Sequence, residues 1–78
     1  MPNAQLHASI LEHLRGSGEP VREAYLYERV CAGVAVEPAQ FVDALVRLEV
    51  EGRVHVDPVH DEVRDRPPFQ PRFWRITD

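Results

Sequence analysis

The sequence predicts a small α+β fold in which three helices precede an antiparallel wing of two or three strands. Three segments repeat apolar residues at helical spacing, and Gly or Pro separates them. After Gly52 the spacing changes to the two-residue alternation of a strand. The chain has 78 residues, 44% of them hydrophobic and 28% charged. That composition is ordinary for a folded protein, so we expect one domain over residues 1–78.

The first predicted helix covers about residues 4–15. Its apolar side chains recur at four-residue steps from Leu6 to Leu14, which places them on one face. Asn3 is suited to the N-cap, since its side chain can accept a hydrogen bond from a free helical N–H. Glycines in the segment 16–18 favour a stop there.

The second predicted helix covers about residues 22–31. Leu26 and Val30 form its inward stripe. Tyr25 and Tyr27 are separated by about 200° around a helix, so at most one of them can be deeply buried.

The third predicted helix covers about residues 38–51 and ends at Gly52. Pro38 suits the first helical position, where its missing N–H costs nothing. Glu37 is then the cap, and Gln40 can reach back toward it as a loose capping box. The predicted core face consists of Phe41, Ala44, Leu45 and Leu48.

Two strands are predicted at about residues 53–57 and 72–77, with a long loop over 58–71 between them. A short extended link is expected near Val21. The hairpin has one apolar face, and the three helices are the surface that it can cover. We expect Trp74 in that core, although an indole among arginines can also stack on nucleic-acid bases.

The segment from Glu37 to Val54 resembles the third helix and first wing strand of bacterial winged helix-turn-helix proteins. These commonly carry a Leu-x-x-Leu-Glu-x-x-Gly-x-Val pattern, matched here by Leu45, Leu48, Glu49, Gly52 and Val54. The last predicted strand, Arg72 to Thr77, resembles the closing wing strand of PadR- and MarR-type regulators.

This resemblance implies binding to duplex DNA by a small transcriptional regulator or DNA-processing accessory protein. In such proteins the third helix enters the major groove and the wing touches phosphates. Gln40 and Arg47 are the expected groove readers. The expected phosphate contacts are Arg64, Arg66, Arg72 and Arg75.

Charge argues against DNA on the third helix. Residues 1–51 carry eight acidic and four basic side chains, and Asp43 lies on the outward arc. All nine basic residues are Arg, which fits either bidentate anion recognition or a genome biased toward Arg. The wing arginines can alternatively pair with nearby acids, namely Asp61, Glu62 and Asp65.

A second apolar stripe on the third helix predicts a different kind of partner. It consists of Ala39, Val42, Val46 and Val50. The stripe lies about 140° from the core stripe, and soluble monomers rarely expose such a row. It can be the seam of a homodimer or the docking face for another protein. Alternatively, the N-terminal arm, the wing loop or the second helix covers part of it.

We expect no catalysis, no cofactor, no small-molecule substrate and no metal site. No nucleophile has a base and an orienting acid beside it, and the run His60-Asp61-Glu62 lacks the convergent ligands of a specific site. Cys31 is predicted to be a small buried side chain of the core. No membrane span or signal peptide is evident, so the expected location is the cytoplasm. The expected function is DNA binding, and the alternative is a protein-interaction module without DNA binding.

Overall fold

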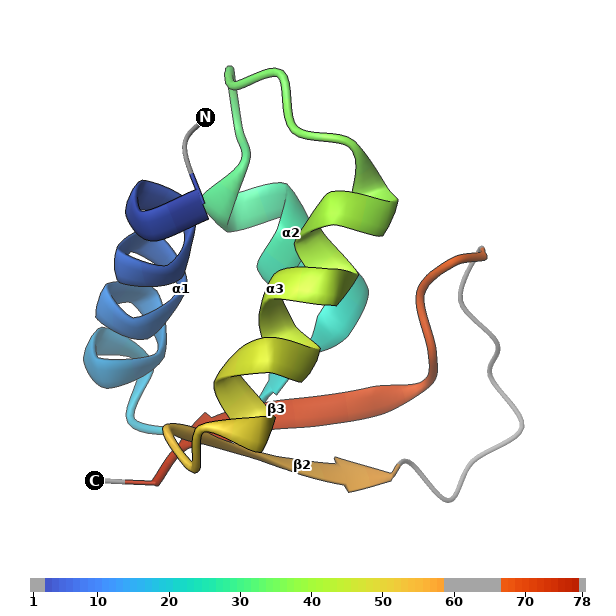
Figure 1. Ribbon diagram of the computed structural model, residues 1–78. Helices are drawn as coiled ribbons and strands as arrows, with labels where there is room; N and C mark the ends of the chain where they lie inside the picture. Colours follow the sequence, from blue (N-terminus) through green and yellow to red (C-terminus); the bar gives the residue numbers. More distant parts are fainter. Residues whose placement is uncertain (1–2, 59–66, 78) are drawn as a thin grey trace.

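Three helices pack on one face of a three-stranded antiparallel sheet (Figure 1). The computed structural model describes residues 3–58 and 67–77. In chain order the elements are α1 (Asn3–Ser17), β1 (Val21–Arg22), α2 (Glu23–Val30), α3 (Pro38–Val50), β2 (Val54–Pro58) and β3 (Arg72–Ile76). This confirms the predicted α+β fold, with the layout of a winged helix.

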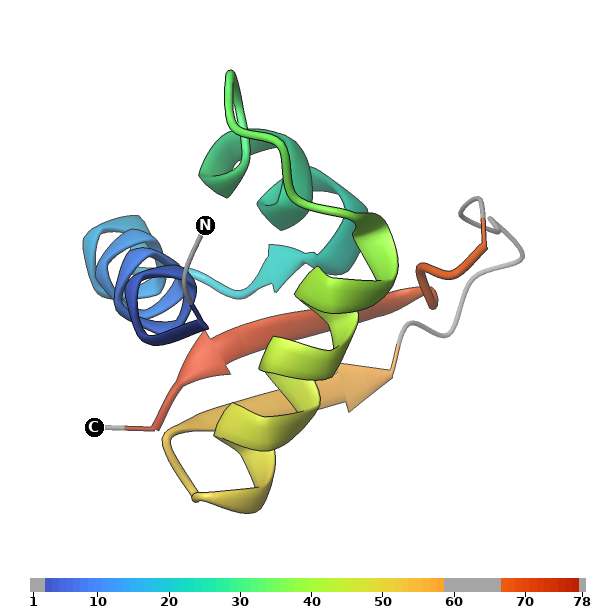
Figure 2. The same ribbon diagram turned by 45° about the horizontal axis from the view of Figure 1, so that its top comes forward.

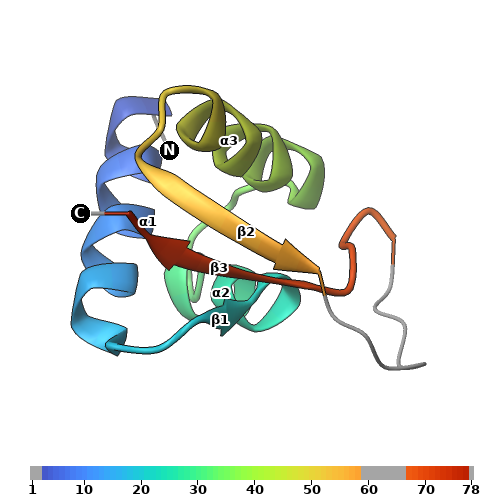
Figure 3. The same ribbon diagram turned by 90° about the horizontal axis from the view of Figure 1, so that it is seen from below.

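The last strand, β3, lies in the middle of the sheet, between β1 and β2 (Figure 3). Both neighbours run antiparallel to it, and Trp74 pairs with Val21 on one side and Val56 on the other. The predicted hairpin of β2 and β3 is therefore confirmed, and the short extended link near Val21 forms the third strand of the sheet.

Trp74 is fully buried between the sheet and the helices. The fully buried apolar side chains around it come from all three helices: Leu6, Ile10, Leu26, Phe41, Leu45 and Leu48. Phe41, Ala44, Leu45 and Leu48 are all buried, so the predicted core face of α3 is confirmed. Cys31 is also buried, as expected of a small apolar filler. In a chain this short, one buried indole supplies a large share of the core.

Two helix starts differ from the prediction. Asn3 is the first residue of α1 rather than the residue before it. Arg22 belongs to β1 instead of α2, because it pairs with Phe73 in the sheet. The end of α1 also differs, because the helix continues through Gly16 to Ser17 before Gly18 with φ of 69°, whereas the stop at Gly52, with φ of 76°, is confirmed.

The start of α3 lacks the full capping box. Glu37 is the N-cap residue and Pro38 opens the helix, as predicted, but the Glu37 side chain makes no capping hydrogen bond. The Gln40 amide instead donates to Asn3 Oδ1 at 3.3 Å. This contact ties the first turn of α3 to the first residue of α1.

Tyr27 is the more buried of the two tyrosines on α2, as the helical spacing required. Tyr25 is 49% exposed. The Tyr27 ring packs against Phe41 and Phe69, with centroid distances of 5.3 and 5.1 Å, and its hydroxyl donates to the Val36 carbonyl. Burial raises the pKa of the Tyr27 hydroxyl. Phe69, which precedes β3, is thus held by the helices.

Candidate functional site

The outward side of α3 carries the apolar stripe that the sequence predicts. Ala39 is exposed and Val42 is half-buried. Val46 and Val50 have exposed fractions of 40% and 81%. These four residues are called the α3 stripe below. The buried residues of α3 lie on the opposite side, so the helix is apolar on two faces and only one of them reaches the core.

Of the four stripe residues, only Val42 is half-buried; most of the wing loop that was the alternative cover lies outside the described residues. In Figure 2, α3 (yellow-green) lies to the right of α1 (blue), with α2 (teal) behind. The exposed fractions of Val46 and Val50 show that the second half of the stripe meets solvent. A row of branched apolar side chains on a small protein is a feature of interfaces.

Arg47, one of the two predicted groove readers, is paired with an acid on its own helix. Its Nε lies 2.9 Å from Asp43 Oδ2, one helical turn earlier. The two side chains are 65% and 62% exposed, so the pair stays in water and contributes little to stability. Asp43 therefore offsets the positive charge that a phosphate would meet. Gln40, the other predicted reader, contacts Asn3 as described.

Arg72, predicted to hold phosphate, is bound to a buried carboxylate that sequence reasoning missed. Glu23, the first residue of α2, is fully buried. Its Oε1 accepts hydrogen bonds from Arg72 Nε at 2.6 Å and Trp74 Nε1 at 2.9 Å, and its Oε2 accepts from the Gln70 N–H at 2.7 Å. Arg72 is 24% exposed, and its guanidinium lies 5.0 Å from the centroid of the Trp74 ring.

A signal for the Glu23 site did exist in the sequence. A buried indole N–H needs an acceptor. Continuing the pairing of Arg22 with Phe73 by one residue along each antiparallel strand brings Glu23 opposite Arg72. Without the register of β1 on β3, however, the sequence contains several acidic residues that could accept from the Trp74 indole, and it does not indicate which one does.

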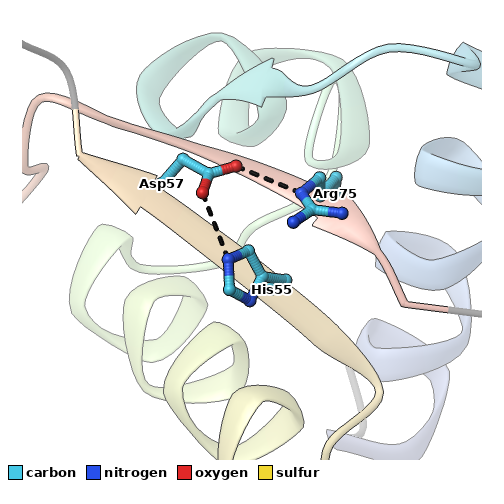
Figure 4. Close-up of polar contacts among 3 residues, drawn as sticks. All are labelled: His55, Asp57 and Arg75. Carbon is cyan, nitrogen blue, oxygen red and sulfur yellow. Dashed lines mark hydrogen bonds and ion pairs between the residues drawn. The ribbon is translucent and has the colours of Figure 1, made fainter.

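Arg75, another predicted phosphate contact, lies on the sheet face opposite the helices, as Trp74 beside it points into the core. Figure 4 shows Asp57 between Arg75 and His55. Arg75 Nε and His55 Nε2 each lie 3.1 Å from a different oxygen of Asp57. The hydrogen bond from Arg75 lowers the pKa of Asp57, with the charges of His55 and Arg75 acting in the same direction and partial desolvation opposing them.

The remaining predicted phosphate contacts, Arg64 and Arg66, lie outside the described residues, as does the run His60-Asp61-Glu62. The proposed acidic partners Asp61, Glu62 and Asp65 lie outside them too. Within residues 3–58 and 67–77, no three His, Cys, Asp or Glu side chains gather as a metal site needs. Over the same residues, no helix has the length and hydropathy required to cross a membrane.

The structure thus brings the α3 stripe together on one surface and separates the predicted DNA contacts. Arg47 lies on α3, Arg72 faces Glu23 and Arg75 lies on the outer face of the sheet. Comparison of the chain with protein-family models, curated proteins and solved structures gives no match.

Proposed function

We propose that this chain is a non-enzymatic protein-interaction module that docks through the α3 stripe. The observation that carries the proposal is the exposure of Val46 and Val50 on a helix whose other apolar face is already buried. Removing such side chains from water on docking contributes roughly 25 cal/mol per Å² of apolar surface.

The charges around the stripe suit a protein partner. The apolar centre of a protein interface is depleted in charge and surrounded by a polar rim. The α3 stripe has this pattern, with Asp43 and Arg47 on one flank and Glu49 on the other. The flanking pair of Asp43 and Arg47 is internally neutral, so it does not select for a polyanion.

The same charges disfavour a nucleic-acid partner on α3. Residues 37–53 carry four acidic side chains and two basic ones. Each described arginine among the predicted DNA contacts has a carboxylate partner: Arg47 with Asp43, Arg72 with Glu23 and Arg75 with Asp57. Affinity for DNA grows with the number of phosphates that a protein neutralises, and these pairs reduce the charge available for that.

DNA binding is the second candidate, and the layout of the fold favours it. In the winged-helix mode of binding the third helix enters the major groove and the wing touches phosphates, and this chain has both a third helix and an antiparallel β2–β3 pair. Arg64 and Arg66, between β2 and β3 in the sequence, are the predicted phosphate contacts. A regulator of this kind, as in the bacterial proteins that the sequence resembles, would act in the cytoplasm.

A titration of labelled mixed-sequence duplex DNA at low and moderate salt separates the candidates, with the mass of the chain measured by light scattering on the same samples. The proposal expects Arg47→Ala and Val46→Glu to leave any DNA affinity unchanged, because α3 then faces a protein. The double variant Arg64→Ala/Arg66→Ala removes the predicted phosphate contacts of the wing and is compared with Arg47→Ala on the same DNA. A tenfold loss of affinity with Arg47→Ala, together with a shallower salt dependence, would overturn the proposal.

A further inference from the structure

We infer that the partner of the α3 stripe is the α3 stripe of a second copy of this chain, packed antiparallel to it about a two-fold axis. The inference rests on the proposed function and names the partner that docks on the α3 stripe. Two observations carry it, namely the order of side-chain sizes along the stripe and the order of charges on its flank.

The stripe is self-complementary when one copy is reversed. A two-fold axis that crosses α3 between Val42 and Val46 places Val42 of each copy against Val46 of the other. The same axis places Ala39, the smallest member, against Val50, the most exposed member. Small residues facing large ones allow two helices to interdigitate without voids.

The flanking charges are self-complementary in the same arrangement. At about 100° per residue, Asp43 and Arg47 lie on one flank of the stripe. An antiparallel two-fold pairing places this flank against the same flank of the second copy, with the order of its residues reversed. Asp43 of each copy then meets Arg47 of the other, which gives two symmetric ion pairs beside the apolar seam.

On the other flank, the two Glu49 side chains do not meet in this register. Glu49 lies near the end of α3, so reversing the second copy places Glu49 opposite the beginning of that copy's helix at Pro38. The two Glu49 side chains are then separated by about ten residues along the helix axis, or roughly 15 Å. The ion pair of Asp43 and Arg47, at 2.9 Å within one copy, exchanges partners on association.

The contact is small, which sets the expected affinity. A helix of 13 residues is about 20 Å long, and a pair of such helices falls at the low end of interface sizes. We therefore expect a weak, reversible dimer with a Kd on the order of 10 μM.

Sedimentation velocity over a concentration series tests the pairing. Wild-type protein should shift from monomer to dimer, and Val46→Glu should weaken the dimer at least tenfold by placing charge in the seam. Asp43→Arg should weaken it as well, because the introduced arginine then faces Arg47 of the second copy at each of the two symmetric sites. The double variant Asp43→Arg/Arg47→Asp restores opposite charges and should recover the wild-type Kd. Glu28→Arg, an exposed change on α2, is the control for charge alone.

Cross-linking tests the direction of the helices. A mixture of Ala39→Cys and Val50→Cys chains should form a mixed disulfide dimer on mild oxidation, since these positions face each other across the axis. Wild-type protein, with its single buried Cys31, gives the background. Preferred linkage of Ala39→Cys chains to one another would contradict the antiparallel register.

The failure of this inference differs from the failure of the proposed function. A wild-type chain that remains monomeric at millimolar concentration overturns the second copy as the partner. If DNA affinity is also insensitive to Arg47→Ala, the α3 stripe remains a docking face for a different protein. If Arg47→Ala abolishes DNA binding by that monomer, both proposals fail.

Discussion

The carboxylate of Glu23 joins the beginning of α2 to β3 and to the segment before it. It accepts hydrogen bonds from the side chains of Arg72 and Trp74 and from the backbone of Gln70. An acid in the first turn of a helix also interacts favourably with the helix dipole. A buried carboxylate is tolerated here because charged and neutral donors occupy both of its oxygens.

Replacing Glu23 with Gln should lower the free energy of unfolding by about 2 kcal/mol, as expected for the loss of hydrogen bonds to a charged group. The amide NH₂ would face one of the three donors, and Arg72 would lose its counter-charge. Urea denaturation measures the change. Glu28→Gln, an exposed change on the same helix, is the control and should be neutral. Equal midpoints for the two variants would contradict this role of Glu23.

Asp57 on the outer face of the sheet gives a prediction about pH. Its pKa is lowered chiefly by the hydrogen bond from Arg75, so Arg75→Gln should raise it toward the ordinary value. A folded-state pKa below the unfolded one means that the contribution to stability is complete above the unfolded pKa. It is then lost as the pH falls through the folded pKa. NMR titration of the Asp57 carboxyl measures the shift, and Arg47→Gln should leave it unchanged. An unaltered Asp57 pKa in Arg75→Gln would exclude this cause.

At the scale of elements, helix ends are set by backbone conformation that glycine alone adopts easily. Gly52 follows α3 with φ of 76°, whereas Gly16 lies inside α1. A Cβ at either position would meet no atom within 4 Å. The two sites therefore differ in backbone conformation and not in available space.

Gly52→Ala should destabilise the protein by roughly 1 kcal/mol, because an L side chain is strained at positive φ. Gly16→Ala should stabilise it by about 0.5–1 kcal/mol, since Ala is the better helix former. Thermal unfolding of the two variants measures both signs. Stabilisation by Gly52→Ala would contradict the left-handed ending of α3.

Helices, strands and the core were predictable because their signals are local. The four-residue steps from Leu6 to Leu14 and the alternation after Gly52 depend only on neighbouring residues. The α3 stripe was predictable for the same reason, because its residues also recur at helical spacing, on the side of α3 opposite the core face. The partners of Arg72 and Arg75 were not predictable, because Glu23 and Asp57 are chosen by the register of β3.

At the scale of the whole molecule, the α3 stripe does not belong to the buried core between the sheet and the helices. The core takes Trp74 from the sheet and one face of each helix. A chain of this size has little apolar surface to spare, and the exposure of Val46 and Val50 supports the proposed docking role. The charges of Arg47, Arg72 and Arg75 are meanwhile offset by Asp43, Glu23 and Asp57.

Methyl NMR over a dilution series tests self-association through the α3 stripe most directly. The account predicts that the methyl resonances of Val46 and Val50 move with protein concentration as the stripe becomes covered. Val34 lies outside α3 with an exposed fraction of 39%, close to that of Val46, and its methyl resonances should stay fixed. Val54, which is buried, should also stay fixed. Resonances of Val46 and Val50 that move no more than those of Val34 would contradict self-association through this stripe.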